Sequence, residues 1–181
     1  MMILEINEKS ELFEPLFNVY CKYFPEIERN TLDSVKKYLH ECAYHSDWDY
    51  ICLVALTEDG VIAGGMYLNV FYDICSIVTE FLFVKEEFRG QGIAQTLLDH
   101  VHEQFPNFGH VIEVEKSNPV QNFWVKMGFT EVDFEYEQPP IVEGRKPYGG
   151  LMLMQRGFVG NDYTWLVETL LKQHYWKYAF V

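Results

Sequence analysis

The sequence of 181 residues lacks a dense group of lysines and arginines, a C-x-x-C pair, and an apolar run long enough to span a membrane. Its net charge is −13, so without a basic cluster the chain repels nucleic-acid phosphates, and we expect no nucleic-acid partner. The wide spacing of the cysteines argues against a zinc site, and their even number alone does not establish disulfides. The cysteines are Cys21, Cys42, Cys52 and Cys75.

Two further absences bear on location and on metals. Residues 1–7 have the pattern of a strand rather than of a targeting segment, and with no membrane-spanning run this indicates a cytoplasmic protein without a membrane partner. Neither His40 with His45 nor His100 with His102 has the i, i+4 spacing of a helical metal pair, so we expect no metal. The excess of acidic residues suits a cationic substrate, although it serves solubility equally well.

The composition is that of an ordinary globular protein, with 49% hydrophobic residues, and the sequence has no internal repeat, low-complexity tract or linker. We therefore expect one domain over residues 1–181. Apolar periodicity predicts a mixed α/β (α+β) fold with hairpins. The predicted segments are a strand at 1–7, helices at 10–24 and 30–43, strands at 50–57, 61–72 and 74–84, a helix at 93–104, a strand at 109–115, a helix at 117–128, strands at 129–136 and 149–156, and a helix at about 161–178.

The stretch FRGQGIAQTLL, residues 88–98, places two glycines before the helix predicted at 93–104. Such a turn aims backbone N–H groups at one point, and the helix N-terminus adds about half a positive charge, so it suits a pyrophosphate. A phosphate-binding loop of the NTPase type is excluded because the Gly-Lys-Ser/Thr ending is absent. A dinucleotide fold is rejected because Gln95 stands where a small residue is needed and because several elements precede the motif. The plain alternative is a tight strand-to-helix connection.

Within this stretch, RGQGIA matches the pattern Gln/Arg-x-x-Gly-x-Gly/Ala, with Arg89, Gly92 and Ala94 at the defining positions. The downstream NPVQNFWVKMGF, residues 118–129, resembles the second signature of the same family. Over about residues 1–157 the chain thus resembles the GNAT superfamily of acyl-CoA-dependent N-acetyltransferases. The resemblance implies a mixed, mostly antiparallel sheet with a central splay between two strands and helices on both faces. The C-terminal helix lies outside it.

The resemblance also implies acetyl-CoA as co-substrate and assigns residues to it. Backbone N–H groups of Gln91 to Gln95 would hold the pyrophosphate, and the backbone at Leu82 and Val84 would hold the pantetheine arm and the acetyl carbonyl. Asn118 would touch the pantetheine arm, although it would serve equally well as a helix N-cap. The predicted coenzyme-binding residues are Leu82, Val84, Arg89, Gly90, Gln91, Gly92, Ile93, Ala94, Gln95 and Asn118.

Glu80 is the candidate general base. Strict alternation in the strand at 74–84 places it on the same face as Leu82 and Val84, and a carboxylate in an otherwise apolar strand requires an explanation. Family members often carry a Glu or His on this strand that takes the amine proton through water. The alternative is a carboxylate that pairs with a neighbouring cation or faces solvent.

The candidate general acid is harder to find. Many family members have a tyrosine in the second signature, where this chain has Trp124. An indole N–H donates a hydrogen bond but is not a usable proton source near neutral pH. An aromatic residue on a short amphipathic helix more commonly belongs to the core. A hydroxyl could instead come from another tyrosine, and the sequence does not choose among them. The candidates are Tyr67, Tyr72, Tyr136 and Tyr148.

The function that the resemblance implies is acetyl transfer from acetyl-CoA to a primary amine of a small molecule or peptide, by direct transfer. The acidic composition favours a cationic acceptor such as a polyamine, an aminoglycoside or lysine. The alternative is a GNAT-like module that binds acyl-CoA with little or no activity, which Trp124 supports and Glu80 opposes. The helix at 161–178 has an apolar face that packs on its own domain or in a dimer, so monomer and homodimer are both open.

Overall fold

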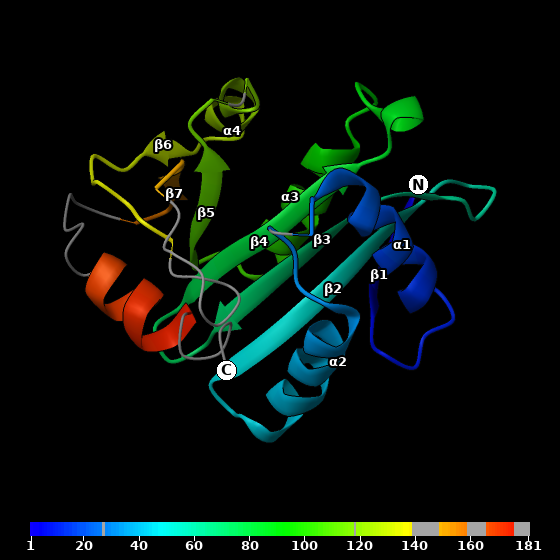
Figure 1. Ribbon diagram of the computed structural model, residues 1–181, viewed down its shortest axis with the longest axis horizontal. Coiled ribbons are helices and arrows are strands. Elements are labelled where there is room, and N and C mark those ends of the chain that lie inside the picture. Colours follow the sequence, from blue (N-terminus) through cyan, green and yellow to red (C-terminus); the bar gives the residue numbers. More distant parts are fainter. Residues whose placement is uncertain (27, 118, 139–148, 159–165, 176–181) are drawn as a thin grey trace. The chain divides into compact units, whose positions relative to one another are not determined.

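The computed structural model describes residues 1–26, 28–117, 119–138, 149–158 and 166–175. Their helices and strands follow the predicted order (Figure 1). The strands are β1 (Met2–Ile6), β2 (Trp48–Leu56), β3 (Ile62–Phe71), β4 (Ser76–Val84), β5 (Gly109–Glu115), β6 (Thr130–Glu131) and β7 (Leu151–Arg156). The helices are α1 (Phe13–Tyr23), α2 (Leu32–Glu41), α3 (Ile93–Gln104) and α4 (Gln121–Lys126), with 3₁₀ turns η1 (Cys42–Tyr44) and η2 (Glu86–Phe88) and a helix of π type, η3 (Leu166–Tyr175).

The seven strands form one sheet in the order β1-β2-β3-β4-β5-β7-β6. The pairs β1–β2, β5–β7 and β6–β7 are antiparallel, whereas β4 and β5 are parallel. The sheet is therefore mixed and mostly antiparallel, as the resemblance implied. The pairing of β4 with β5 runs from Ser76 to Thr79, although β4 itself continues to Val84. It ends in the region where the resemblance placed the splay.

Internal contacts divide the chain into two compact units. The first contains Met1–Val70 and Glu80–Pro106, and the second contains Phe71–Thr79 and Asn107–Val181. Strand β4 contributes to both units, so the division does not cut the chain into successive domains. A single domain over residues 1–181 stays a prediction.

In the first unit, α1 and α2 lie on one face of the strands and α3 lies on the other (Figure 1). The buried side chains of α1 recur at helical spacing, namely Phe13, Leu16 and Tyr20, while Pro15 lies in the first turn, where a missing N–H costs nothing. At the start of α2 the Thr31 hydroxyl accepts a hydrogen bond of 3.1 Å from the N–H of Ser34. Thr31 is therefore the N-cap, which the sequence had left open between it and Asn30.

In the second unit, the short helix α4 ends as predicted. Gly128 has φ 84°, and the next N–H, that of Phe129, returns to the Trp124 carbonyl over 3.0 Å. The predicted strand at 129–136 is too long, however, because β6 covers only Thr130–Glu131. The Phe134 N–H bonds back to the Val132 carbonyl, which turns the chain out of the ladder.

The predicted C-terminal helix is only partly described. Its central residues form η3, in which Leu170 and Leu171 are fully buried. The rest of the predicted range 161–178, with Trp165, lies outside the described residues, so the helix is not confirmed as predicted. None of the helices in the described ranges is long and apolar enough to cross a membrane.

Candidate active site

The loop between β4 and α3 contains two glycines in the left-handed conformation. Gly90 has φ 75° and Gly92 has φ 81°, values that residues with a Cβ adopt only with strain. A Cβ added to either glycine would meet no atom within 4 Å. The backbone conformation, rather than crowding by neighbours, therefore calls for glycine at these positions, and the surface of the loop stays open.

The backbone N–H groups from Gly90 to Gln95 have no intramolecular acceptor among the hydrogen bonds of the described residues. On either side the bonds resume: the N–H of Arg89 donates to Glu86 over 3.2 Å, and that of Thr96 donates to Gly92 over 2.9 Å. Successive unpaired N–H groups at the N-terminus of a twelve-residue helix form a site for an anion. The predicted pyrophosphate residues therefore lie together and fit that ligand.

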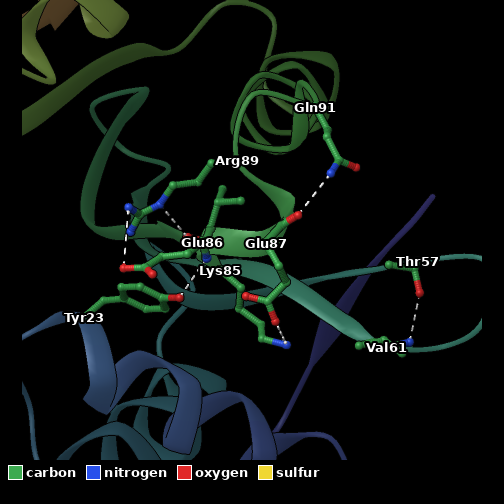
Figure 2. A network of polar contacts seen from close by, with 9 residues as sticks. Tyr23, Thr57, Val61, Lys85, Glu86, Glu87, Arg89 and Gln91 are labelled. Carbon is green, nitrogen blue, oxygen red and sulfur yellow. Dashed lines mark hydrogen bonds and ion pairs between the residues drawn. The ribbon is translucent and has the colours of Figure 1, made fainter.

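The Arg89 side chain lies back across the loop, as Figure 2 shows. Its Nε donates a hydrogen bond of 3.2 Å to the carbonyl of Val84, and its Nη1 lies 3.9 Å from the Glu86 carboxylate. The guanidinium carbon stands 5.4 Å from the centroid of the Tyr23 ring. Arg89 is thus held in place by the end of β4, by the η2 turn and by α1.

A second set of contacts fixes the other side of the η2 turn (Figure 2). The Lys85 ammonium lies 2.7 Å from the Glu87 carboxylate, and the hydrogen bond between them lowers the pKa of Glu87. The Gln91 side-chain amide donates to the Glu87 carbonyl over 3.2 Å. Both positively charged side chains of the loop therefore have carboxylate partners within the turn itself.

Strand β4 alternates strictly near its end. Phe81 and Phe83 both pack against the Tyr20 ring of α1, with centroid distances of 4.8 and 5.9 Å. Leu82 and Val84 are half-buried and alternate with them, so their side chains point to the opposite face. These are the two residues whose backbone the resemblance assigns to the pantetheine arm.

Glu80 accepts hydrogen bonds from three neutral side chains. Tyr50 Oη and Asn30 Nδ2 donate to Oε2 over 2.9 and 3.1 Å, and Asn69 Nδ2 donates to Oε1 over 3.0 Å. The network continues beyond these donors, because Trp48 Nε1 donates to Asn69 Oδ1 over 2.8 Å. These bonds bring β2, β3, β4 and the segment before α2 onto one carboxylate.

The charge of Glu80 affects its buried neighbours. Burial is the largest cause of the raised pKa of the Tyr50 hydroxyl and of the Cys52 thiol, and the negative charge of Glu80 is the next. Tyr38 follows the same pattern. Tyr50 therefore stays protonated at neutral pH and donates its hydrogen to the carboxylate.

The face on which Glu80 lies differs from the prediction. Glu80 bonds to Asn69, and Phe81 contacts Tyr67 with a centroid distance of 6.3 Å, although Tyr67 and Asn69 occupy the same face of β3. Adjacent residues of β4 thus turn toward one face, and strict alternation is interrupted between them. The placement of Glu80 with Leu82 and Val84 was wrong for this reason.

The partners of Glu80 were not predicted from the sequence. Asn69 is a buried polar residue in a strand of mostly apolar residues, which is the same signal that singled out Glu80, whereas Tyr50 is a buried aromatic residue. Asn30 had been considered only as a helix cap. Tyr23, at the end of α1, gave no signal in the sequence, because its contacts with the loop depend on the packing of α1 beside η2.

The tyrosines considered as acids have different environments. The Tyr67 hydroxyl is fully buried and has no hydrogen-bond partner among the described residues, and burial raises its pKa far above the ordinary value. The Tyr136 hydroxyl is buried and donates to the Glu113 carboxylate. Tyr72 is exposed. Tyr148 lies outside the described residues, and so does Asn118, whose role as cap or coenzyme ligand stays a prediction.

Trp124 belongs to the core of the second unit. Its side chain is 7% exposed, and its ring lies 5.2 Å from that of Phe129 and 5.1 Å from that of Phe123. The core position considered for it is therefore the one observed. Among the described residues, no group of three or more His, Cys, Asp or Glu side chains lies close enough together to hold a metal ion.

Comparison with known proteins decides the family. The family model described as "Acetyltransferase (GNAT) family" matches residues 13–129, more than half of the chain. The chain belongs to the GNAT family. The match includes Glu80, the glycine loop and α4. The protein is accordingly an N-acetyltransferase that binds coenzyme A, with acetyl-CoA as co-substrate in the manner typical of the family.

Solved structures share the fold at low identity. A GNAT-family protein from Bacteroides thetaiotaomicron is 20% identical with a TM-score of 0.76, covering 94% of this chain and 96% of that one. An aminoglycoside 6'-N-acetyltransferase complexed with coenzyme A is 14% identical with a TM-score of 0.62, covering 86% and 96%. A chimeric spermidine N-acetyltransferase that includes Vibrio cholerae sequence is 16% identical with a TM-score of 0.62, covering 86% and 95%. No curated protein matches this sequence closely enough to count as a relative.

Proposed function

We propose that this GNAT protein transfers the acetyl group of acetyl-CoA directly to the primary amine of a small molecule or peptide. The observation that carries the donor half of this proposal is the row of backbone N–H groups from Gly90 to Gln95, which lack an acceptor within the part of the chain that the structure describes. The acceptor half rests on Glu80, a half-buried carboxylate at the middle of β4. Two of the structural relatives named above are acetyltransferases of amines, an aminoglycoside in one case and spermidine in the other.

The chemistry follows from the charge of the acceptor. An alkylammonium has a pKa of about 10.4, so the amine must lose a proton before its nitrogen attacks the thioester carbonyl carbon. Glu80 takes that proton through water. The C–N bond forms as the C–S bond breaks, the nitrogen gives up its second proton to become an amide, and the departing thiolate of coenzyme A takes up a proton from solvent or from an acidic side chain.

The neutral donors around Glu80 keep its carboxylate ready for this role. Hydrogen bonds from Tyr50, Asn30 and Asn69 stabilise the charged form and fix the position of both oxygens. The negative charge of the carboxylate attracts a cationic amine. The net charge of −13 supports the same acceptor class, a cationic amine such as a polyamine, an aminoglycoside or lysine.

The experiment is thiol release from acetyl-CoA with a panel of amines, run beside a thermal-shift titration with coenzyme A. We expect coenzyme A to raise the melting temperature and at least one amine to stimulate thiol release. Trp124, buried in the place of the usual tyrosine, favours the second candidate function, an acyl-CoA-binding module. Binding of coenzyme A without amine-dependent thiol release across polyamines, aminoglycosides, lysine peptides and simple alkylamines would establish that module instead.

A further inference from the structure

The last turn of α1 reaches the coenzyme loop through one side chain, that of Tyr23. Its hydroxyl accepts a hydrogen bond of 3.0 Å from the backbone N–H of Glu86, and its ring lies 5.4 Å from the guanidinium carbon of Arg89. The same ring stacks on Phe83, at 6.3 Å and an interplanar angle of 23°. Figure 2 shows Tyr23 between α1 and the turn. It contacts the strand, the turn and the loop at once.

The contact with Glu86 satisfies a backbone group that the turn cannot satisfy itself. Glu86 is the first residue of η2, and the first N–H groups of such a turn have no partner within it. The following bonds are internal, because Phe88 N–H donates to Lys85 over 2.9 Å and Arg89 N–H donates to Glu86 over 3.2 Å. Tyr23 thus fixes the start of the turn, and the turn fixes the residues that follow.

The contact with Arg89 fixes the other end of the turn. The guanidinium lies over the Tyr23 ring while its Nε bonds to the Val84 carbonyl, so its position is set by three groups that include the nearby Glu86 carboxylate. Gly90 and Gly92 come directly after it. The direction in which the N–H groups of residues 90–95 point therefore depends on where Arg89 is held.

From these contacts we propose that Tyr23 is a positioning residue for the coenzyme: it holds the η2 turn and Arg89 so that the N–H groups of residues 90–95 converge on the pyrophosphate. The inference rests on the proposed use of those N–H groups. Tyr23 touches no reacting atom in this proposal, and it acts through Glu86 and Arg89.

The stability of α1 depends on other side chains, which allows this role to be tested. Its packing rests on the fully buried Phe13, Leu16 and Tyr20, whereas Tyr23 is only half-buried. Truncation of Tyr23 therefore should change coenzyme affinity more than it changes folding. If Tyr23 had a purely structural role, its truncation would change folding stability more than coenzyme affinity.

The test compares Tyr23→Phe and Tyr23→Leu with the wild-type chain by calorimetric titration with coenzyme A. Tyr23→Phe removes the bond to Glu86 and should weaken coenzyme binding about two- to tenfold. Tyr23→Leu also removes the ring beneath Arg89 and should weaken it about two- to fivefold more. The KM for acetyl-CoA should rise with the dissociation constant, while the KM for the amine stays within experimental error.

Tyr44→Phe and Tyr44→Leu are the matched controls. Tyr44 lies in the same unit, is 76% exposed and has its ring against His40 rather than against the loop. These two variants should bind coenzyme A as the wild type does.

Three outcomes would overturn the inference. Unchanged coenzyme affinity in both Tyr23 variants would do so while leaving the proposed function intact. A loss of affinity that matches a loss of melting temperature, with equal changes in the KM for the amine, would show a structural role instead. Failure of the wild-type chain to bind coenzyme A would remove the proposed function and this inference with it.

Discussion

Tyr50 of β2 donates its hydroxyl hydrogen to Glu80 of β4 over 2.9 Å. The two residues are thirty positions apart, and the bond is part of a network that also contains Asn30 and Asn69. Several neutral donors on one carboxylate fix the orientation of its two oxygens. In the proposed reaction this network holds the Glu80 carboxylate in one position, and it explains how a charged side chain is accommodated in this part of the sheet.

The first prediction concerns Glu80 itself. Glu80→Gln should lower kcat at neutral pH by about a hundredfold or more, because the amine proton loses its acceptor. Part of the lost kcat should be recovered at a pH near the pKa of the amine, where the amine loses its proton without a base. Tyr50→Phe is the companion variant, since it keeps the carboxylate and should retain most of the turnover. Steady-state rates across pH, with coenzyme affinity measured in parallel, provide the check. A wild-type kcat in Glu80→Gln would remove this residue from the mechanism.

The second prediction concerns the glycine loop. Gly92→Ala should cost about 1–2 kcal/mol of folding stability because its φ is 81°, and should weaken coenzyme A binding at least about tenfold. Gly60→Ala is a matched control: Gly60 has φ 78° and equally open surroundings, but it lies in the turn between β2 and β3. It should lose similar stability and keep its affinity. Urea unfolding and calorimetric titration distinguish the two, and equal losses of affinity would argue against the loop as the coenzyme site.

The third prediction concerns Trp124. Since its ring is buried against Phe129, Trp124→Ala should lower the free energy of unfolding by about 3–5 kcal/mol. Trp124→Phe should keep kcat within about twofold, because a group that gives no proton in the transition state contributes little to its stability. Urea denaturation and initial rates test both variants. A large fall in kcat for Trp124→Phe at wild-type stability would instead give the indole a part in catalysis.

The fourth prediction concerns alkaline pH. Burial, followed by the charge of Glu80, raises the pKa of Cys52 well above its ordinary value of 9.0. The unfolded chain therefore ionises this thiol first, so the free energy of unfolding should fall as pH rises above about 9, by up to about 1.4 kcal/mol per pH unit for this group. The raised pKa values of Tyr50 and Tyr38 act in the same direction above their ordinary value of 10.0.

The check is urea unfolding at a series of pH values from 8 to 10.5. Cys52→Ala should show a shallower decline of stability than the wild type. Cys75→Ala, which removes an exposed thiol, is the control and should follow the wild-type curve. Identical slopes in all three chains would mean that burial of Cys52 does not govern its ionisation.

Most of the elements were predictable because their signals are local. The helix predicted at 93–104 has those bounds in the structure, and the strand at 109–115 likewise, since apolar periodicity and the glycines before the helix determine both. The strand predicted at 129–136 was too long because the turn from Val132 to Phe134 contains no glycine or proline that would indicate it in the sequence. The face of β4 predicted for Glu80 was wrong, because the prediction assumed strict alternation through a strand in which alternation is interrupted.

The sequence by itself determined the order of the elements and the glycine loop, because each depends on neighbours within a few residues, and the acyl donor followed from the resemblance to the GNAT family. Only the tertiary structure decided which groups surround Glu80 and what holds the loop. Asn30 and Tyr50 approach Glu80 from fifty and thirty positions away, and Tyr23 reaches Glu86 across sixty-three. Such contacts arise when separate elements pack on one sheet, and no local pattern of residue types specifies them.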